Sequence, residues 1–142
     1  MGGPRRGIVS ARVRPLTVTL TLALLAASGC GGGGEHGGAG GPATTVAAGG
    51  PLVVTAREYA LTPGNVVVAG PGPLRLRLRN SGSLPHDVRV QSGDRDLGGT
   101  PSIPGGKSAT ATVMLAPGRY RILCTVGDHA QLGMKGTLRV KE

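Results

Sequence analysis

The chain has 142 residues, with 16 lysines and arginines against seven acidic residues, and its only aromatic side chains are two tyrosines. This length allows one domain with appendages, and so few aromatic side chains argue against a stacking platform for single-stranded nucleic acid. We therefore expect no nucleic-acid partner. The excess positive charge leaves open an electrostatic attraction to an acidic protein or to anionic lipid.

The N-terminal segment has the pattern of an export signal. Four arginines precede an uncharged apolar stretch of 13 residues, from Leu16 to Ser28. As a helix this stretch would be about 20 Å long, which is too short to span a hydrocarbon core of roughly 30 Å but suits a signal peptide. It ends in Ala27-Ser28-Gly29-Cys30, which resembles a bacterial lipobox. We predict that residues 1–30 are a signal segment and that Cys30 is lipidated; the alternative is an ordinary cleaved signal in which Cys30 has no role.

A glycine-rich segment follows, with ten glycines in residues 31–50. Such a composition cannot bury a core, so we predict a flexible linker here. The folded domain is then expected over residues 51–142. If Cys30 carries lipid, Cys124 has no disulfide partner, and a free thiol in an oxidising compartment needs burial or a metal.

The domain has the pattern of short β-strands separated by turn residues. Strands are predicted over residues 52–58, 65–69, 73–80, 86–91, 107–115, 119–125 and 134–141. The third of them alternates strictly, with Leu74, Leu76 and Leu78 on one face and three arginines on the other. This pattern predicts an all-β Greek-key sandwich or barrel of about seven to eight strands. Its core would be rich in valine, leucine and alanine, with Met114 as an ordinary core methionine.

Alternation also brings candidate ligands together. Because residues two apart on a strand share a face, His86, Cys124 and Met134 take inward positions at strand ends, each aligned with apolar neighbours. His129 lies on the loop between two of these strands. Singly, each residue has an ordinary structural explanation as a buried cysteine, a core methionine, or a turn or loop histidine. Together, one thiolate, two imidazoles and a distant thioether are the ligands of a blue-copper site.

The flanking sequence resembles the cupredoxins, the group that contains plastocyanin, azurin and auracyanin. The resemblance is carried by the run from Cys124 to Met134, by Asn80-Ser-Gly-Ser-Leu-Pro-His86-Asp and by Met134-Lys-Gly-Thr-Leu-Arg-Val140, and it extends over residues 51–142. It implies a cupredoxin-like fold and one copper ion, cycling between Cu(I) and Cu(II), held by His86, Cys124, His129 and Met134. It further implies a one-electron carrier, not an enzyme, with transient redox partners and no need to oligomerise.

Two positions depart from the family pattern. Asp87 follows the first histidine where relatives often have asparagine, and Gly127-Asp128 precedes the second histidine without the usual proline. Neither change removes a ligand, but both affect the hydrogen bonds around the site. The resemblance also places His129 near the surface, with an apolar rim formed by Leu84, Pro85, Ala130 and Leu132.

Other functions remain open. The principal alternative is an extracytoplasmic copper-binding or delivery protein without an electron-transfer role; a β-sandwich interaction module with a vestigial site is another. A copper enzyme is disfavoured, because the His-x-His and His-Cys-His patterns of multicopper oxidases do not occur. With its signal segment, the protein is expected to be exported and lipid-anchored on the extracytoplasmic or periplasmic side of a bacterial membrane.

Overall fold

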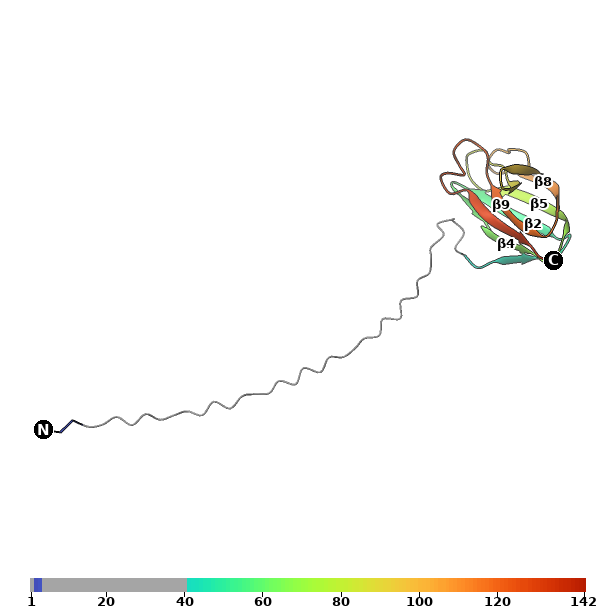
Figure 1. Cartoon of the computed structure of the whole chain (residues 1–142). Helices are drawn as coiled ribbons and strands as arrows, with labels where there is room; N and C mark the ends of the chain where they lie inside the picture. Colours follow the sequence, from blue (N-terminus) through green and yellow to red (C-terminus); the bar gives the residue numbers. More distant parts are fainter. Residues whose placement is uncertain (1, 4–40) are drawn as a thin grey trace. The chain divides into compact units, whose positions relative to one another are not determined.

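The computed structural model describes residues 2–3 and 41–142 (Figure 1). The predicted signal segment, the lipidation site Cys30 and most of the predicted linker lie outside these residues. Within them, no helix is long and apolar enough to cross a membrane.

Ten strands of the described residues form two sheets (Figure 1). The strands are β1 (Thr44–Val46), β2 (Pro51–Arg57), β3 (Ala60–Thr62), β4 (Asn65–Val68), β5 (Gly72–Asn80), β6 (Arg89–Ser92), β7 (Arg95–Gly99), β8 (Ser108–Leu115), β9 (Gly118–Leu123) and β10 (Lys135–Val140). One sheet has the order β1-β4-β10-β9-β6-β7, and the other has the order β3-β2-β5-β8. The predicted all-β sandwich is confirmed.

The strand count differs from the prediction because β1, β3 and β7 are short and lack a clear alternation. β1 lies within residues 31–50, where the sequence predicted a linker; it instead pairs in parallel with β4 and buries Val46. The strand predicted from residue 86 begins at Arg89. It begins later than predicted because His86, Asp87 and Val88 are all buried, so alternation fails over these residues. His86 instead forms an isolated β-bridge to Ile103.

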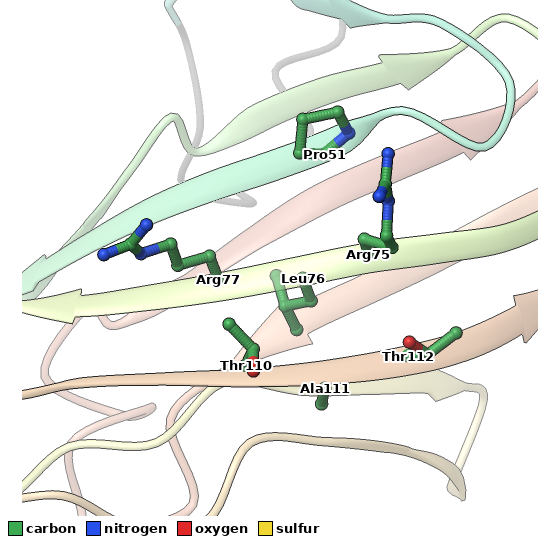
Figure 2. Close-up of a pocket in the computed structure, with 7 residues that line it drawn as sticks. All are labelled: Pro51, Arg75, Leu76, Arg77, Thr110, Ala111 and Thr112. Carbon is green, nitrogen blue, oxygen red and sulfur yellow. The ribbon is translucent and has the colours of Figure 1, made fainter.

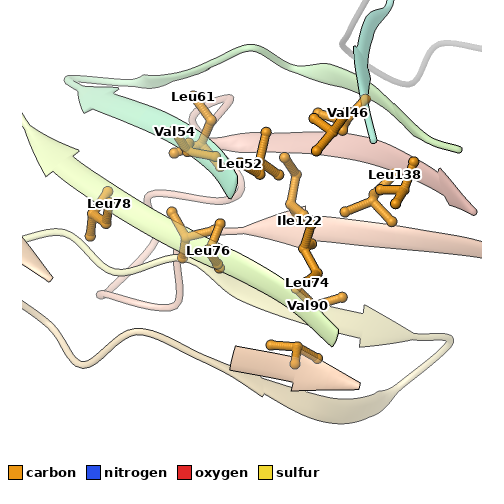
Figure 3. Packing of buried hydrophobic residues seen from close by; sticks show 14 of the residues in the cluster. Val46, Leu52, Val54, Leu61, Leu74, Leu76, Leu78, Val90, Ile122 and Leu138 are labelled. Atoms are coloured by element: carbon orange, nitrogen blue, oxygen red, sulfur yellow. The ribbon is translucent and has the colours of Figure 1, made fainter. Parts of the chain in front are cut away.

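Strand β5 shows how the sequence builds the sandwich. Arg75 and Arg77 lie on the outer face of the sheet (Figure 2), and Arg79 is exposed in the same alternation. Leu74, Leu76 and Leu78 point into the core (Figure 3). Full burial of each leucine contributes roughly 1.5–3 kcal/mol. The two sheets close over aliphatic side chains, and every buried hydrophobic residue of the described part lies between Val46 and Val140. Residues 41–142 lie within one compact unit of the chain, and they supply all of its described core.

Met114 is an exception to the predicted core. Its side chain is 69% exposed, whereas its neighbours Val113 and Leu115 are buried. Because adjacent residues of a strand face opposite sides, Met114 must point outward when its neighbours point inward. The prediction that it is a core methionine is wrong.

Candidate metal centre

Three potential metal ligands converge at one end of the sandwich, which we call the ligand pole; β2, β5 and β9 end there and β10 begins. Nδ1 of His86 lies 3.2 Å from Nδ1 of His129. Sγ of Cys124 lies 3.9 Å from the first nitrogen and 3.6 Å from the second. All three side chains are buried, and their ligand atoms lie within 4.8 Å of one another. The structure thus brings together these three predicted residues.

The position of His86 is fixed by its backbone and by Asn80. The backbone N–H of His86 donates to the carbonyl of Ile103 at 3.0 Å, and the reverse bond is 2.9 Å. The buried amide of Asn80 donates to the carbonyls of Leu84 and Ile103 at 2.8 and 2.9 Å. Asn80 therefore ties the loop that leads to His86 to the segment with which His86 pairs.

The loop from Cys124 to Met134 is closed by its own backbone. The N–H of Cys124 donates to the carbonyl of Met134 at 3.0 Å, and the N–H of Met134 donates to the carbonyl of His129 at 2.9 Å. These bonds hold His129 over the end of β9. Met134 is fully buried in the core at the foot of the same loop. Its role as a fourth ligand stays a prediction.

Asp87 links the two ligand-bearing segments. Its carboxylate accepts a 2.6 Å hydrogen bond from the backbone N–H of Thr125 and a 2.5 Å bond from the Thr125 hydroxyl. Asp87 directly follows His86, and Thr125 directly follows Cys124. The aspartate that departs from the family pattern therefore makes the connection between the two loops.

Glu58 is a residue of the site that sequence reasoning missed. Its Oε1 lies 3.4 Å from Nε2 of His86, a distance longer than a well-formed hydrogen bond; within the described residues, this buried nitrogen has no hydrogen-bond partner. Oε1 also accepts 2.7 Å bonds from the N–H groups of Leu84 and Ser83. The bond from Leu84, followed by those from Glu58's own N–H and from Ser83, lowers the pKa of the carboxyl to about 2. An ionised carboxylate thus faces Nε2 of His86, on the side of the ring away from Cys124.

The next residue, Tyr59, contacts the other imidazole. The rings of Tyr59 and His129 are edge to face, with centroids 5.1 Å apart. His129 itself is only 7% exposed, while Tyr59, Leu84 and Leu132 are exposed hydrophobic residues. The predicted rim therefore includes a phenol ring that sequence reasoning missed. Nothing in the sequence signals either contact, because both residues lie just beyond the end of β2, far from the ligand motifs.

The residues present fit copper. A thiolate with two imidazoles is a donor set that suits this metal, and each imidazole turns Nδ1 toward the common point. Binding through Nδ1 leaves the His86 proton on Nε2, opposite the Glu58 carboxylate, as expected for a ligand histidine. Burial raises the pKa of the Cys124 thiol, so a metal has to displace its proton.

No family model matches the sequence, and a search of the curated proteins also finds no match. Solved structures, however, share the fold. Reduced auracyanin from Roseiflexus castenholzii superposes with a TM-score of 0.59 at 18% identity, covering 65% of this chain and 97% of that one. Auracyanin A from Chloroflexus aurantiacus, described as a "blue" copper protein, gives 0.55 at 18% identity over 65% and 100% of the two chains. Rusticyanin from Thiobacillus ferrooxidans gives 0.54 at 21% identity over 68% and 82%. The domain thus has the cupredoxin fold.

Proposed function

We propose that this protein is a type 1 copper protein that carries one electron at a time. The observation that carries this proposal is the buried cluster of His86, Cys124 and His129, with its ligand atoms within 4.8 Å of one another. It occurs in a fold shared with auracyanins and rusticyanin. Copper bound there would supply a Cu(I)/Cu(II) couple, and Met134 is the proposed weak fourth ligand.

The chain's own residues suit this task because they hold the donors in place. Backbone bonds fix the loop from Cys124 to Met134, and Asp87 joins it to the segment of His86. Burial of all three ligands excludes water from their surroundings. A donor array that moves little favours rapid electron transfer, since little reorganisation accompanies a change of charge.

We further propose that the rim around His129 is where transient redox partners dock. Tyr59, Leu84 and Leu132 are exposed hydrophobic residues, and Tyr59 packs directly on the His129 ring. Small apolar contacts of this kind suit short-lived redox encounters. The ring edge of His129 then lies close to the partner, and no oligomer is required.

Copper titration of the metal-free domain, residues 41–142, tests the proposed function. We expect one equivalent of Cu(II) to produce an intense visible charge-transfer absorption, which C124S abolishes and the exposed-residue control S102A retains. Reversible one-electron reduction should then be seen by voltammetry. Tight Cu(I) binding without colour or reversible reduction would support the alternative, a copper-delivery protein, and contradict the carrier.

We also propose that the protein is exported and anchored by lipid on Cys30. The supporting features are the arginines and apolar stretch before Cys30 and the lipobox-like residues up to it. In cells fed a labelled fatty acid, the wild-type chain should incorporate the label and C30A should not. Release of an unlabelled wild-type protein from the membrane would contradict lipid anchoring.

A further inference from the structure

The outer face of the four-stranded sheet carries four exposed arginines, which we call the arginine face: Arg57, Arg75, Arg77 and Arg79. The last three alternate on β5 with the buried leucines, so their side chains share one side of the sheet. Residues two apart on a strand are about 6.6 Å apart, which makes this row roughly 13 Å long. Arg57 extends the face onto β2 at the ligand pole.

This charge is not neutralised by the protein. None of the four strands β2, β3, β5 and β8 contains an aspartate or glutamate. Among the described residues, no arginine of the face belongs to an ion pair. On the other sheet, Arg89 lies 2.6 Å from Asp96 and Arg121 lies 3.6 Å from Asp94. Within the described part of the chain, Arg95, Arg119 and Arg139 of that sheet also belong to no ion pair. The arginine face is thus a cationic surface whose counter-charge has to come from outside the domain.

Hydroxyl and apolar groups accompany the arginines. Thr112 pairs in register with Arg75, and Thr110 pairs with Arg77. These four residues line a groove of about 600 Å³, in which both arginines stand on β5 between Pro51 of β2 and the threonines of β8 (Figure 2). Two exposed apolar side chains lie on the same face, Val53 at 43% exposure and Met114 at 69%.

We propose that the arginine face binds the anionic surface of a phospholipid membrane. Guanidinium groups form bidentate bonds with phosphate, and threonine hydroxyls can donate further bonds to the same headgroups. Val53 and Met114 can enter the boundary between headgroups and acyl chains, where apolar side chains are favoured. A row of cations along one face of the sheet, with apolar residues among them, matches a surface of many phosphates better than one small anion.

The orientation that follows leaves the ligand pole accessible. The arginine row lies along the side of the sandwich, whereas His129 and its rim lie at the end. A domain resting on lipid through β2, β5 and β8 therefore presents its rim sideways to partners at the membrane. The proposal concerns the protein surface alone and does not depend on whether copper binds.

Vesicle sedimentation tests the proposal with residues 41–142, which contain the described core of one compact unit and lack the apolar N-terminal segment. The domain should bind vesicles of phosphatidylglycerol and phosphatidylcholine at low salt, and should not bind pure phosphatidylcholine. High salt should release it, because screening weakens surface charge interactions. Each arginine near an anionic surface contributes about fivefold to binding, so R75Q/R77Q/R79Q should bind on the order of 100-fold more weakly.

A second triple variant provides the matched control. R95Q/R119Q/R139Q removes the same net charge from exposed positions on the other sheet, and its binding should change by less than about threefold. Equal losses in the two triple variants would overturn the proposal, as would equal binding to neutral and anionic vesicles. A domain that binds polyglutamate through the same three arginines, but does not bind vesicles, would show that the face binds an acidic protein. In that case the membrane proposal fails. The single variant R77Q provides a milder test should the triple variant fold poorly.

Discussion

The carboxylate of Glu58 lies behind the imidazole of His86, with Oε1 3.4 Å from Nε2, while Nδ1 of the same ring faces Cys124. The two nitrogens of His86 thus face different groups. A carboxylate on the far side favours the proton on Nε2, which leaves the lone pair of Nδ1 free for a metal. Glu58 is itself held by the N–H groups of Ser83 and Leu84, so it connects the ligand to its own loop.

Replacing Glu58 by glutamine should raise the reduction potential of the copper-loaded domain. Removal of a negative charge beside a ligand disfavours Cu(II) more than Cu(I). The metal-free variant should also unfold more easily, because a neutral amide oxygen accepts the two N–H bonds less strongly than a carboxylate. Voltammetry and thermal unfolding measure the two effects. E142Q removes an equal charge at the chain terminus, and a shift as large in that variant would show that Glu58 has no particular influence.

Asp87 should tolerate asparagine but not alanine. Asparagine can keep both bonds to Thr125, since its oxygen accepts from the backbone N–H and its amide donates to the hydroxyl. D87N should therefore be within about 1 kcal/mol of wild type, whereas D87A should lose about 1–3 kcal/mol, because its partners lose their bonds. Denaturant unfolding of the metal-free domain measures this. T125A removes only the hydroxyl bond, so its stability should lie between those of D87N and D87A. A D87A domain as stable as wild type would contradict the linking role of Asp87.

Metal affinity should increase with pH because Cys124 has to lose its proton. Burial raises the pKa of this thiol above its ordinary value of 9.0, so the metal-free form is protonated near neutral pH. Between pH 7 and 8, one displaced proton gives about a tenfold gain in affinity. Competition with a Cu(I) chelator at several pH values measures the slope. C124S should bind Cu(I) weakly and should lose the pH dependence that comes from the Cys124 proton. A pH-independent affinity of the wild-type domain would disprove the expectation.

The hairpin of β6 and β7 should contribute acid-sensitive stability through Asp96. The Arg89 side chain, followed by the N–H of Gly98, lowers the pKa of Asp96 below its ordinary value of 3.8. The unfolded chain then binds more protons than the folded one below about pH 4, so the stabilisation is full above that pH and is lost as the pH falls through the lower folded pKa. Because the pair is partly exposed, D96N should cost less than about 1 kcal/mol at pH 7.

Thermal unfolding between pH 2 and 7 measures this contribution. The curves of wild type and D96N should converge at the acid end. D94N serves as the control, since Asp94 is fully exposed and lies 3.6 Å from its arginine. A constant gap between wild type and D96N over the whole range would refute the assignment.

Alternation predicted those parts of the site that lie on regular strands. It placed His86 and Cys124 on inward faces, and the structure confirms that both are buried together with His129. The same rule, applied to Met114, would have placed it outside, since Val113 and Leu115 point inward. The rule fails at Asp87, which is buried between two buried neighbours because Thr125 supplies its hydrogen bonds.

Contacts made by turns could not be predicted in this way. Glu58 reaches His86 across 28 positions of the chain, and Tyr59 reaches His129 across 70. No periodicity relates such residues; the pairing of β2 with β5 brings the end of β2 to the ligand pole. The short strand β1 could not be predicted for a similar reason. It is stabilised by parallel pairing with β4, and three residues within a glycine-rich segment give no signal of that pairing.

The placement of Tyr59 also gives the molecule an intrinsic optical probe. The chain has no tryptophan and two tyrosines, and of these only Tyr59 makes an edge-to-face contact with the candidate ligand His129. Tyr120 lies on β9, where its hydroxyl donates to the carbonyl of Ala116. In Y120F, ultraviolet emission would therefore arise from one phenol beside the ligand loop, so occupancy and loop opening could be followed without attaching a dye.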